Sequence, residues 1–360
     1  METAEKMYRD GNPEVNTASG IKTGRRMNYL GIILVLLPMA VFLVSFTFGR
    51  YSIPIQDILG IFISKIFGLK ATWGEAVETV IFSVRIPRIF AAMLVGGALS
   101  VSGAAYQGLF KNPMVSPDIL GASAGAGFGA AMAILLSCGL IGVQISSFLF
   151  GMGAVVLTFL VSSLIGRGNN VTLILVLTGM VVSTLFSSFV SITKYVADPE
   201  GKLPAITFWL MGGLSSIRAN DVKIILIPVL IGLIPLILIR WKLNVLSFGE
   251  EEAKAMGIDT TKLRIIVIIC STLLTASAVS ISGMVGWIGL IIPHFARMIV
   301  GPNYKILLPA SLLIGSTFLL LVDDVARSAF TVEIPLGILT SLIGAPFFIY
   351  LLIKGKRGWV

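Results

Sequence analysis

The sequence predicts an all-α protein that crosses a membrane about ten times. Of its 360 residues, 56% are hydrophobic and only 12% are charged, which is about half the charged share of an ordinary soluble protein. The mean hydropathy is +0.96, and apolar stretches long enough to span a bilayer recur from Tyr29 to Leu352. Helices suit such stretches, because a helix satisfies its own backbone hydrogen bonds in lipid.

The elements are expected in the following order. Residues 1–28 are too long and too acidic for the start of a signal peptide and predict a flexible cytoplasmic tail. Residues 29–360 are expected to form one transmembrane domain. Between its first two spans, "IPIQDILGIFISKIF" (53–67) predicts an amphipathic helix on the surface. The expected spans are 29–48, 86–106, 118–138, 145–165, 171–193, 222–240, 264–283, 286–300, 306–326 and 335–353.

Basic residues predict the orientation of these spans. If both termini are cytoplasmic, the short inner loops hold most of the 27 Lys and Arg residues, as the positive-inside rule requires. Arg85, Arg88 and Arg327 then fall at the outer face, against this trend. The net charge of +9 reflects this topology, and no basic run interleaved with aromatic residues suggests a nucleic-acid partner.

A weak internal repeat accompanies the spans. The pattern Ala-x-Ser-x-Ser-Gly at 98–103 recurs at 278–283, and each copy is followed ten residues later by a proline, Pro113 or Pro293. The two copies lie on spans of opposite direction, so the repeat would be inverted, as in many transport proteins. Coincidence in a chain rich in Ser, Ala and Gly is the alternative.

The longest polar insertion is "RWKLNVLSFGEEEAKAMGIDTTKLR" (240–264), on the cytoplasmic side. Its centre favours a short helix bounded by Gly249 and Gly257. A compact cytosolic helix predicts a docking element for a soluble partner, whereas a solvated linker between two spans is the alternative.

Small and polar residues within the spans suggest packing rather than catalysis. Gly121, Gly125 and Gly129 recur every fourth residue, which lets two helices approach closely. They enclose a Gly-x-Ser-x-Gly string around Ser123, but a hydrolase would need a strand-to-helix turn and a nearby histidine, and the chain has one histidine, His294. The two cysteines, Cys138 and Cys270, are interpreted as small core residues and not as metal ligands.

The source of energy is expected to lie outside this chain. No Walker A string or dinucleotide fingerprint occurs, so no nucleotide cofactor is expected. The span interiors hold almost no acids for an ion relay, and Asp323 and Asp324 are interpreted as interfacial. A secondary carrier or channel is therefore the less favoured alternative.

The chain from about residue 30 onward resembles the FecCD family, the permease subunits of ATP-binding cassette (ABC) importers for iron–siderophore complexes, haem and cobalamin. The segments that carry this resemblance are "RIPR" (85–88), "GAAYQGLFKNPMVSPDILGASAGAGFG" (103–129), "FWLMGGLSS" (208–216), "LNVLSFGEEEAKAMG" (243–257), "GWIGLIIPHFARMIVGPNYKILLPAS" (286–311) and "DDVARSAFTVEIPLGILTSLIGAPFFIYLL" (323–352).

The resemblance implies a type II importer fold in the cell membrane, with ten helices and a second permease subunit, identical or related. It implies cytoplasmic ATPases and an external substrate-binding protein as partners, besides membrane lipid, and a bulky ferric chelate as cargo, with haem or cobalamin as alternatives. Arg85, Arg88 and Arg327 match the residues that dock the binding protein. Asn169 and Asn170 match an inner narrowing of the path, although any tight polar turn would look the same. The short helix at 249–257 matches the coupling helix by which such permeases contact the ATPase. The matching residues are Gly249, Glu250, Glu251, Glu252, Ala253, Met256 and Gly257.

Overall fold

The computed structural model describes residues 30–49, 51, 53–67, 74–165, 171–329 and 331–355. Within these ranges the chain is helical and contains no strand. Seven described helices are long and apolar enough to cross a membrane, and three shorter apolar helices accompany them. Each of the expected spans corresponds to one of these, so the all-α polytopic prediction is confirmed. The predicted tail at 1–28 and the pair Asn169 and Asn170 lie outside the described residues.

The helices follow one another from the apolar helix Leu30–Ser45 to the C-terminal α15. A π-helical turn (Val80–Arg85) joins α4 to α5, and a 3-10 turn (Pro117–Leu120) precedes α6. The helices are α3 (Ile55–Phe67), α4 (Glu75–Thr79), α5 (Ile86–Leu109), α6 (Ala122–Leu135), α7 (Gly139–Ile165), α8 (Val171–Val196), α9 (Lys202–Met211), α10 (Ala219–Phe248), α11 (Glu250–Ala255), α12 (Thr260–Ser282), α13 (Ile288–Val300), α14 (Tyr304–Ser328) and α15 (Leu336–Gly355).

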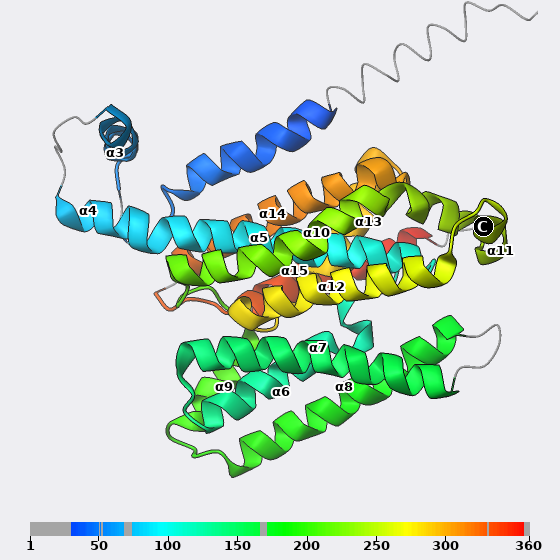
Figure 1. Ribbon diagram of the computed structural model, residues 1–360. Coiled ribbons are helices and arrows are strands. Elements are labelled where there is room, and N and C mark those ends of the chain that lie inside the picture. Colours follow the sequence, from blue (N-terminus) through cyan, green and yellow to red (C-terminus); the bar gives the residue numbers. More distant parts are fainter. Residues whose placement is uncertain are drawn as a thin grey trace, which may run out of the picture.

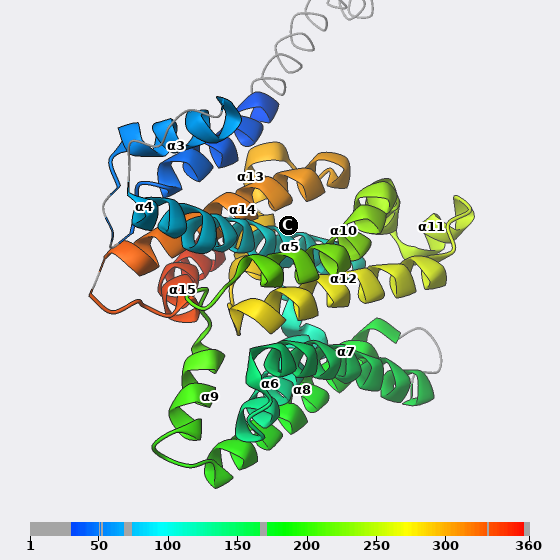
Figure 2. The same ribbon diagram turned by 60° about the vertical axis from the view of Figure 1, so that its left-hand side comes forward.

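The long helices run roughly side by side in a bundle with two distinct ends (Figure 1). We call them the α4 end and the α11 end, after the short helices that lie there. α6, α7 and α8 form a separate group beside the rest in both views (Figures 1 and 2). α5, α12 and α14 are mostly buried, whereas most residues of α7, α8, α10 and α15 are at least partly exposed. The apolar composition of these four helices suits contact with lipid.

Glycines allow α5 to occupy the centre of the bundle. A Cβ atom added to Gly96 would lie 2.2 Å from the backbone oxygen of Gly315 in α14, and one on Gly103 would lie 1.8 Å from that of Gly289 in α13. Neither position can accept a side chain without moving a helix.

The predicted inverted repeat has a structural counterpart in α5 and α12. Their hydroxyl contacts run in opposite directions along the chain, because Ser102 Oγ lies 2.8 Å from Thr275 Oγ1 and Tyr106 Oη lies 3.1 Å from Thr272 Oγ1. Each of the two helices is followed by a short helix, α6 or α13, and then by two longer ones. The packing is reciprocal as well, since α5 contacts α13 and α14 while α12 contacts α6 and α7.

Some element boundaries differ from the prediction. α6 has 14 residues, shorter at both ends than the expected 118–138, whereas α13 has 13 and starts only two residues after the expected 286. At about 1.5 Å per residue, both helices are too short to span a bilayer. The reason lies in the chain before each helix: Gly121 (φ 90°) and Trp287 (φ 70°) adopt left-handed conformations that stop the helix from extending backwards. The helix α9 was not predicted, because its 10 residues carry neither the length nor the spacing of a span.

Candidate functional site

The short helix α11 lies at one end of the bundle, outside the apolar helices (Figures 1 and 2). It begins after Gly249 (φ 148°) and ends before Gly257 (φ 78°), so both glycines predicted as its limits have a backbone that L side chains rarely adopt. At its end, Gly257 N donates to Lys254 O (2.9 Å) and Ile258 N to Ala253 O (3.0 Å). This pair of bonds is a Schellman motif, which defines the exit of the chain from the helix.

α11 is anchored on one face and open on the other. Ala253 is fully buried against the core, whereas Glu251 and Met256 are exposed. An ion pair joins Glu250 to Arg264, in the first turns of α12. On the side of α5 and α8, a polar cleft of about 600 Å³ separates α11 from the bundle.

The start of α12 is fixed by its own cap. The Asp259 carboxylate accepts a hydrogen bond of 3.0 Å from the backbone amide of Lys262. That bond lowers the pKa of the Asp259 carboxyl below its ordinary value.

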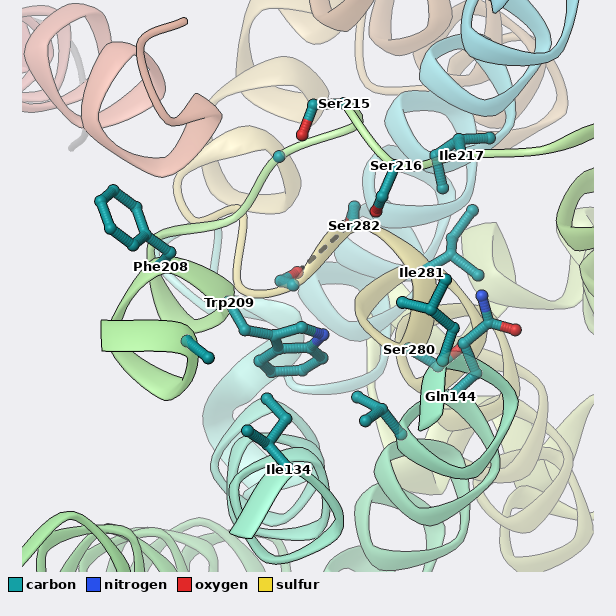
Figure 3. A pocket seen from close by; sticks show the side chains of 15 residues that line it. Ile134, Gln144, Phe208, Trp209, Ser215, Ser216, Ile217, Ser280, Ile281 and Ser282 are labelled. Carbon is teal, nitrogen blue, oxygen red and sulfur yellow. Dashed lines mark hydrogen bonds between the residues drawn. The ribbon is translucent and has the colours of Figure 1, made fainter. Parts of the chain in front are cut away.

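A cavity of about 340 Å³ lies towards the opposite end of the bundle, between α7, α9 and the end of α12. Trp209 and Gln144 point into it, while Phe208 points away (Figure 3). Its remaining polar groups are hydroxyls and backbone atoms, and none of its lining residues is charged. The lining residues that Figure 3 labels are Ile134, Gln144, Phe208, Trp209, Ser215, Ser216, Ile217, Ser280, Ile281 and Ser282.

The three arginines predicted for docking lie together at the α4 end, but they are buried. Arg88 holds Asp323 through contacts of 2.9 to 3.0 Å and Glu333 at 3.0 Å. Arg327 pairs with Asp324 and donates to the backbone oxygen of Ser45 at 2.6 Å. Their side chains are therefore paired inside the chain, and their predicted role in docking stays a prediction.

Arg85 is buried in the same region. It donates to the backbone oxygens of Phe46 and Tyr51, which tethers the segment after the first helix to the start of α5. All three guanidinium groups are occupied within the chain. A docking role would require them to leave partners in a buried environment, where breaking an ion pair is costly.

The acids that pair with these arginines are buried as well. Asp323 is fully buried and Asp324 nearly so, near the end of α14, and both are held in ion pairs within the chain. The spacing of Asp323, Asp324 and Arg327 on one helix could have shown this, because residues three and four apart share a helix face. Glu333 has no such signal, since it reaches Arg88 from the loop before α15.

The predicted packing glycines lie where α6 meets its neighbours. A Cβ on Gly125 would lie 2.5 Å from Phe150 O of α7, and one on Gly129 would lie 2.4 Å from Ser146 O. Gly121 instead faces Ser183 of α8. The hydroxyl of Ser123 donates to Asp118.

The two cysteines differ. Cys270 is buried as expected, but Cys138 is exposed in the turn between α6 and α7, so its interpretation as a core residue is wrong.

Comparison with known proteins shows to which family this chain belongs. The model of the FecCD transport family matches residues 35–354. The chain belongs to the FecCD transport family. It is 44% identical to the molybdate import system permease protein MolB of Haemophilus influenzae, over 91% of this chain and 96% of that one. It is 40% identical to a probable iron chelatin transport system permease of Helicobacter pylori, over 78% and 85% of the two chains.

A solved structure supports the same assignment. An ABC transporter of the metal-chelate type, in an inward-facing conformation, is 42% identical in sequence, with a TM-score of 0.81 over 91% of this chain and 99% of that one. This FecCD chain is thus a transport permease with the fold of an ABC importer. Membership in the family excludes the alternative of a secondary carrier or channel.

Proposed function

We propose that this FecCD chain is the membrane subunit of an importer that moves a metal-containing solute into the cell with energy from a separate ATPase. The observation that carries the proposal is α11, a short helix with defined ends that lies outside the apolar bundle. Its residue Ala253 is buried against the bundle, whereas Glu251 and Met256 are exposed and available to a partner. An ATPase that holds such a helix can bias the two states of the permease.

This role determines which end of the bundle faces each side of the membrane. The α11 end faces the cytoplasm, with both chain termini, and the α4 end faces outward, towards a substrate-binding protein. The basic residues of the inner loops support this orientation. The residues Gly249 to Gly257 form the ATPase contact, and Asn169 and Asn170 remain the proposed inner narrowing of the path.

A second permease subunit completes the path. The cavity of about 340 Å³ lies at the lower end of the range for drug-sized ligands. A bulky ferric chelate therefore needs space between two subunits, identical or related. The uncharged lining suits passage, because a path must hold its cargo weakly enough to release it.

The cargo is proposed as a ferric chelate such as an iron–siderophore complex, in line with the iron chelatin relative. Molybdate is a second candidate, because the identity to the molybdate permease is higher and covers more of the chain. Haem and cobalamin are the remaining alternatives, and cobalamin permeases occur among the relatives.

The three arginines receive a modified role in docking. We propose that Arg85, Arg88 and Arg327 act indirectly, by fixing the outer loops in the shape that a binding protein contacts. Glu333 is one such loop residue, since its carboxylate is held by Arg88 while about a third of its side chain stays exposed.

Uptake by a deletion strain tests this proposal. Cells that lack the chromosomal gene are given radiolabelled molybdate, ferric hydroxamate and catecholate siderophores, haem and cobalamin, with and without a plasmid copy. Plasmid-dependent uptake of one metal-containing solute is expected. Uptake of none of them, with the permease present in the membrane, would contradict the proposed cargo class.

A further inference from the structure

We propose that α12 acts as a rigid rod that carries movement of α11 to the cavity at the other end of the bundle, and that the Glu250–Arg264 ion pair fastens its near end. This inference rests on the proposed docking of an ATPase on α11. Arg264 is a positioning residue, because it acts on the cavity only through α12.

The near end of the rod is held by a partly buried ion pair. The side chain of Arg264 is 14% exposed, whereas that of Lys262, in the same first turns of α12, is 80% exposed. Shielding from water strengthens the pair with Glu250 relative to a surface pair. Both members of the pair line the polar cleft, which leaves little contact between α11 and the helices α5 and α8. A displacement of α11 therefore acts mainly on α10 and α12.

The helix itself is suited to transmit such a displacement. α12 spans 23 residues, or about 34 Å at 1.5 Å per residue. It contains neither glycine nor proline, whereas each of the other described helices of 18 or more residues contains at least one of them. Because sharp kinks arise mostly at these residues, α12 moves as one body.

The hydroxyl contacts with α5 give the rod a point of support. Ser102 Oγ lies 2.8 Å from Thr275 Oγ1 and 3.0 Å from the backbone oxygen of Ser271, near the middle of α12. The central helix α5 thus holds the rod halfway along its length.

The far end of α12 forms part of the cavity wall. Ser280 and Ser282 line the cavity (Figure 3). Gly283, which directly follows α12, lines it as well. The backbone amide of Gly213 donates to Ser282 O at 2.8 Å, and a Cβ on Gly283 would lie 2.2 Å from Trp209 O. This close backbone contact ties the end of the rod to the end of α9.

The same junction reaches α15. The amide of Leu336, the first residue of α15, donates to Gly212 O at 2.9 Å. A Cβ on Gly337 would lie 2.5 Å from Met211 O and 2.9 Å from Met284 O. Movement of α12 therefore shifts the segments that follow α9 and precede α15, together with the part of the cavity wall that follows α9.

A thiol reporter in the cavity tests the rod without any knowledge of the cargo. Ser216→Cys is made in a Cys138→Ser background, because Cys138 is exposed and Cys270 is buried. The permease is reconstituted with its ATPase, and the rate at which an impermeant maleimide labels position 216 is measured with and without ATP. ATP is expected to change this rate by about fivefold or more, the lower range of ordinary coupling between sites.

Variants of the ion pair show whether the ATP effect travels through α12. Arg264→Gln should reduce the ATP effect to less than about twofold, while the ATPase still co-purifies, because Arg264 lies in α12 and not in the proposed ATPase contact. Arg264→Lys keeps a positive charge beside Glu250 and should retain more of the ATP effect than Arg264→Gln. Lys262→Gln is the matched control, and the ATP effect should persist in it.

Two results would overturn the inference. One is an ATP effect that persists unchanged in Arg264→Gln. The other is an unaltered complex in which the ATPase co-purifies and hydrolyses ATP but the labelling rate does not respond. An ATPase that does not bind the unaltered permease would instead refute the proposed function, and the rod with it.

Discussion

Arg88→Met is expected to destabilise the permease strongly, because it leaves a buried carboxylate without its main partner. The side chain of Arg88 is 7% exposed and that of Asp323 is 0% exposed. After the substitution, the nearest cation to Asp323 is Arg327, whose Nε lies 3.8 Å from Oδ2 and already serves Asp324. Removal of one member of a buried ion pair costs about 3–5 kcal/mol, a large part of the net stability of a folded domain, about 5–15 kcal/mol.

The assay is unfolding of the purified permease in mixed micelles by increasing fractions of sodium dodecyl sulfate. Arg88→Met should lower the free energy of unfolding by about 3–5 kcal/mol and lower the amount of permease in the membrane. The double variant Arg88→Met with Asp323→Leu should recover most of the loss, because an apolar pair replaces the orphaned charge. Lys223→Met removes an exposed cation near the start of α10 and should change stability by no more than about 0.5 kcal/mol.

The result that would refute this reasoning is specific. If Arg88→Met unfolds with the free energy of the unaltered chain and reaches normal abundance, yet loses uptake, the guanidinium group acts at a docking surface. The buried network would then not describe the state that meets the binding protein. Charge reversal at Arg88 is a poorer test, because it places a third carboxylate beside Asp323 and Glu333 and lowers abundance for that reason alone.

Three further predictions concern other parts of the molecule. Gly257→Arg should abolish transport, because the bulk and charge at the end of α11 disturb the proposed ATPase contact. The permease should stay folded, because the position is open and its φ of 78° costs another residue only about 1–2 kcal/mol. Normal ATPase co-purification together with normal transport would contradict this. Cysteines at Asp198 and Lys305, both exposed, should react with an impermeant reagent from opposite sides of the membrane, Asp198 from outside, and reaction of both in intact cells would overturn the topology. Gly125→Leu should lower folded yield by forcing α6 away from Phe150 O, whereas Gly153→Leu on the exposed face of α7 should not, and equal yields would refute the close packing of α6 on α7.

The fold was largely predictable because lipid imposes a strong pattern on sequence. Apolar length located every span, and helix-forming residues between Gly249 and Gly257 located α11. A boundary failed at α6, where an apolar sequence continues but the backbone turns at Gly121. Such a turn cannot be predicted from composition, because the residues before and after it in the sequence are apolar alike.

The site was less predictable, because it depends on distant pairs. The three arginines were noticed for their charge, but burial and partners come from tertiary packing that brings α5 beside the end of α14. Arg88 and Asp323 are 235 residues apart, and Arg88 and Glu333 are 245 apart. The cavity likewise combines α6, α7, α9 and α12 through small contacts that no single segment reveals.

The central claim, that this FecCD chain is powered by a separate ATPase, is tested most directly in sealed vesicles that contain the permease, its ATPase and the loaded substrate-binding protein. Accumulation of the radiolabelled solute identified in cells should require ATP on the side of α11. A substitution of the Walker A lysine in the ATPase should abolish that accumulation. Accumulation driven by an ion gradient in vesicles that lack the ATPase would contradict the claim.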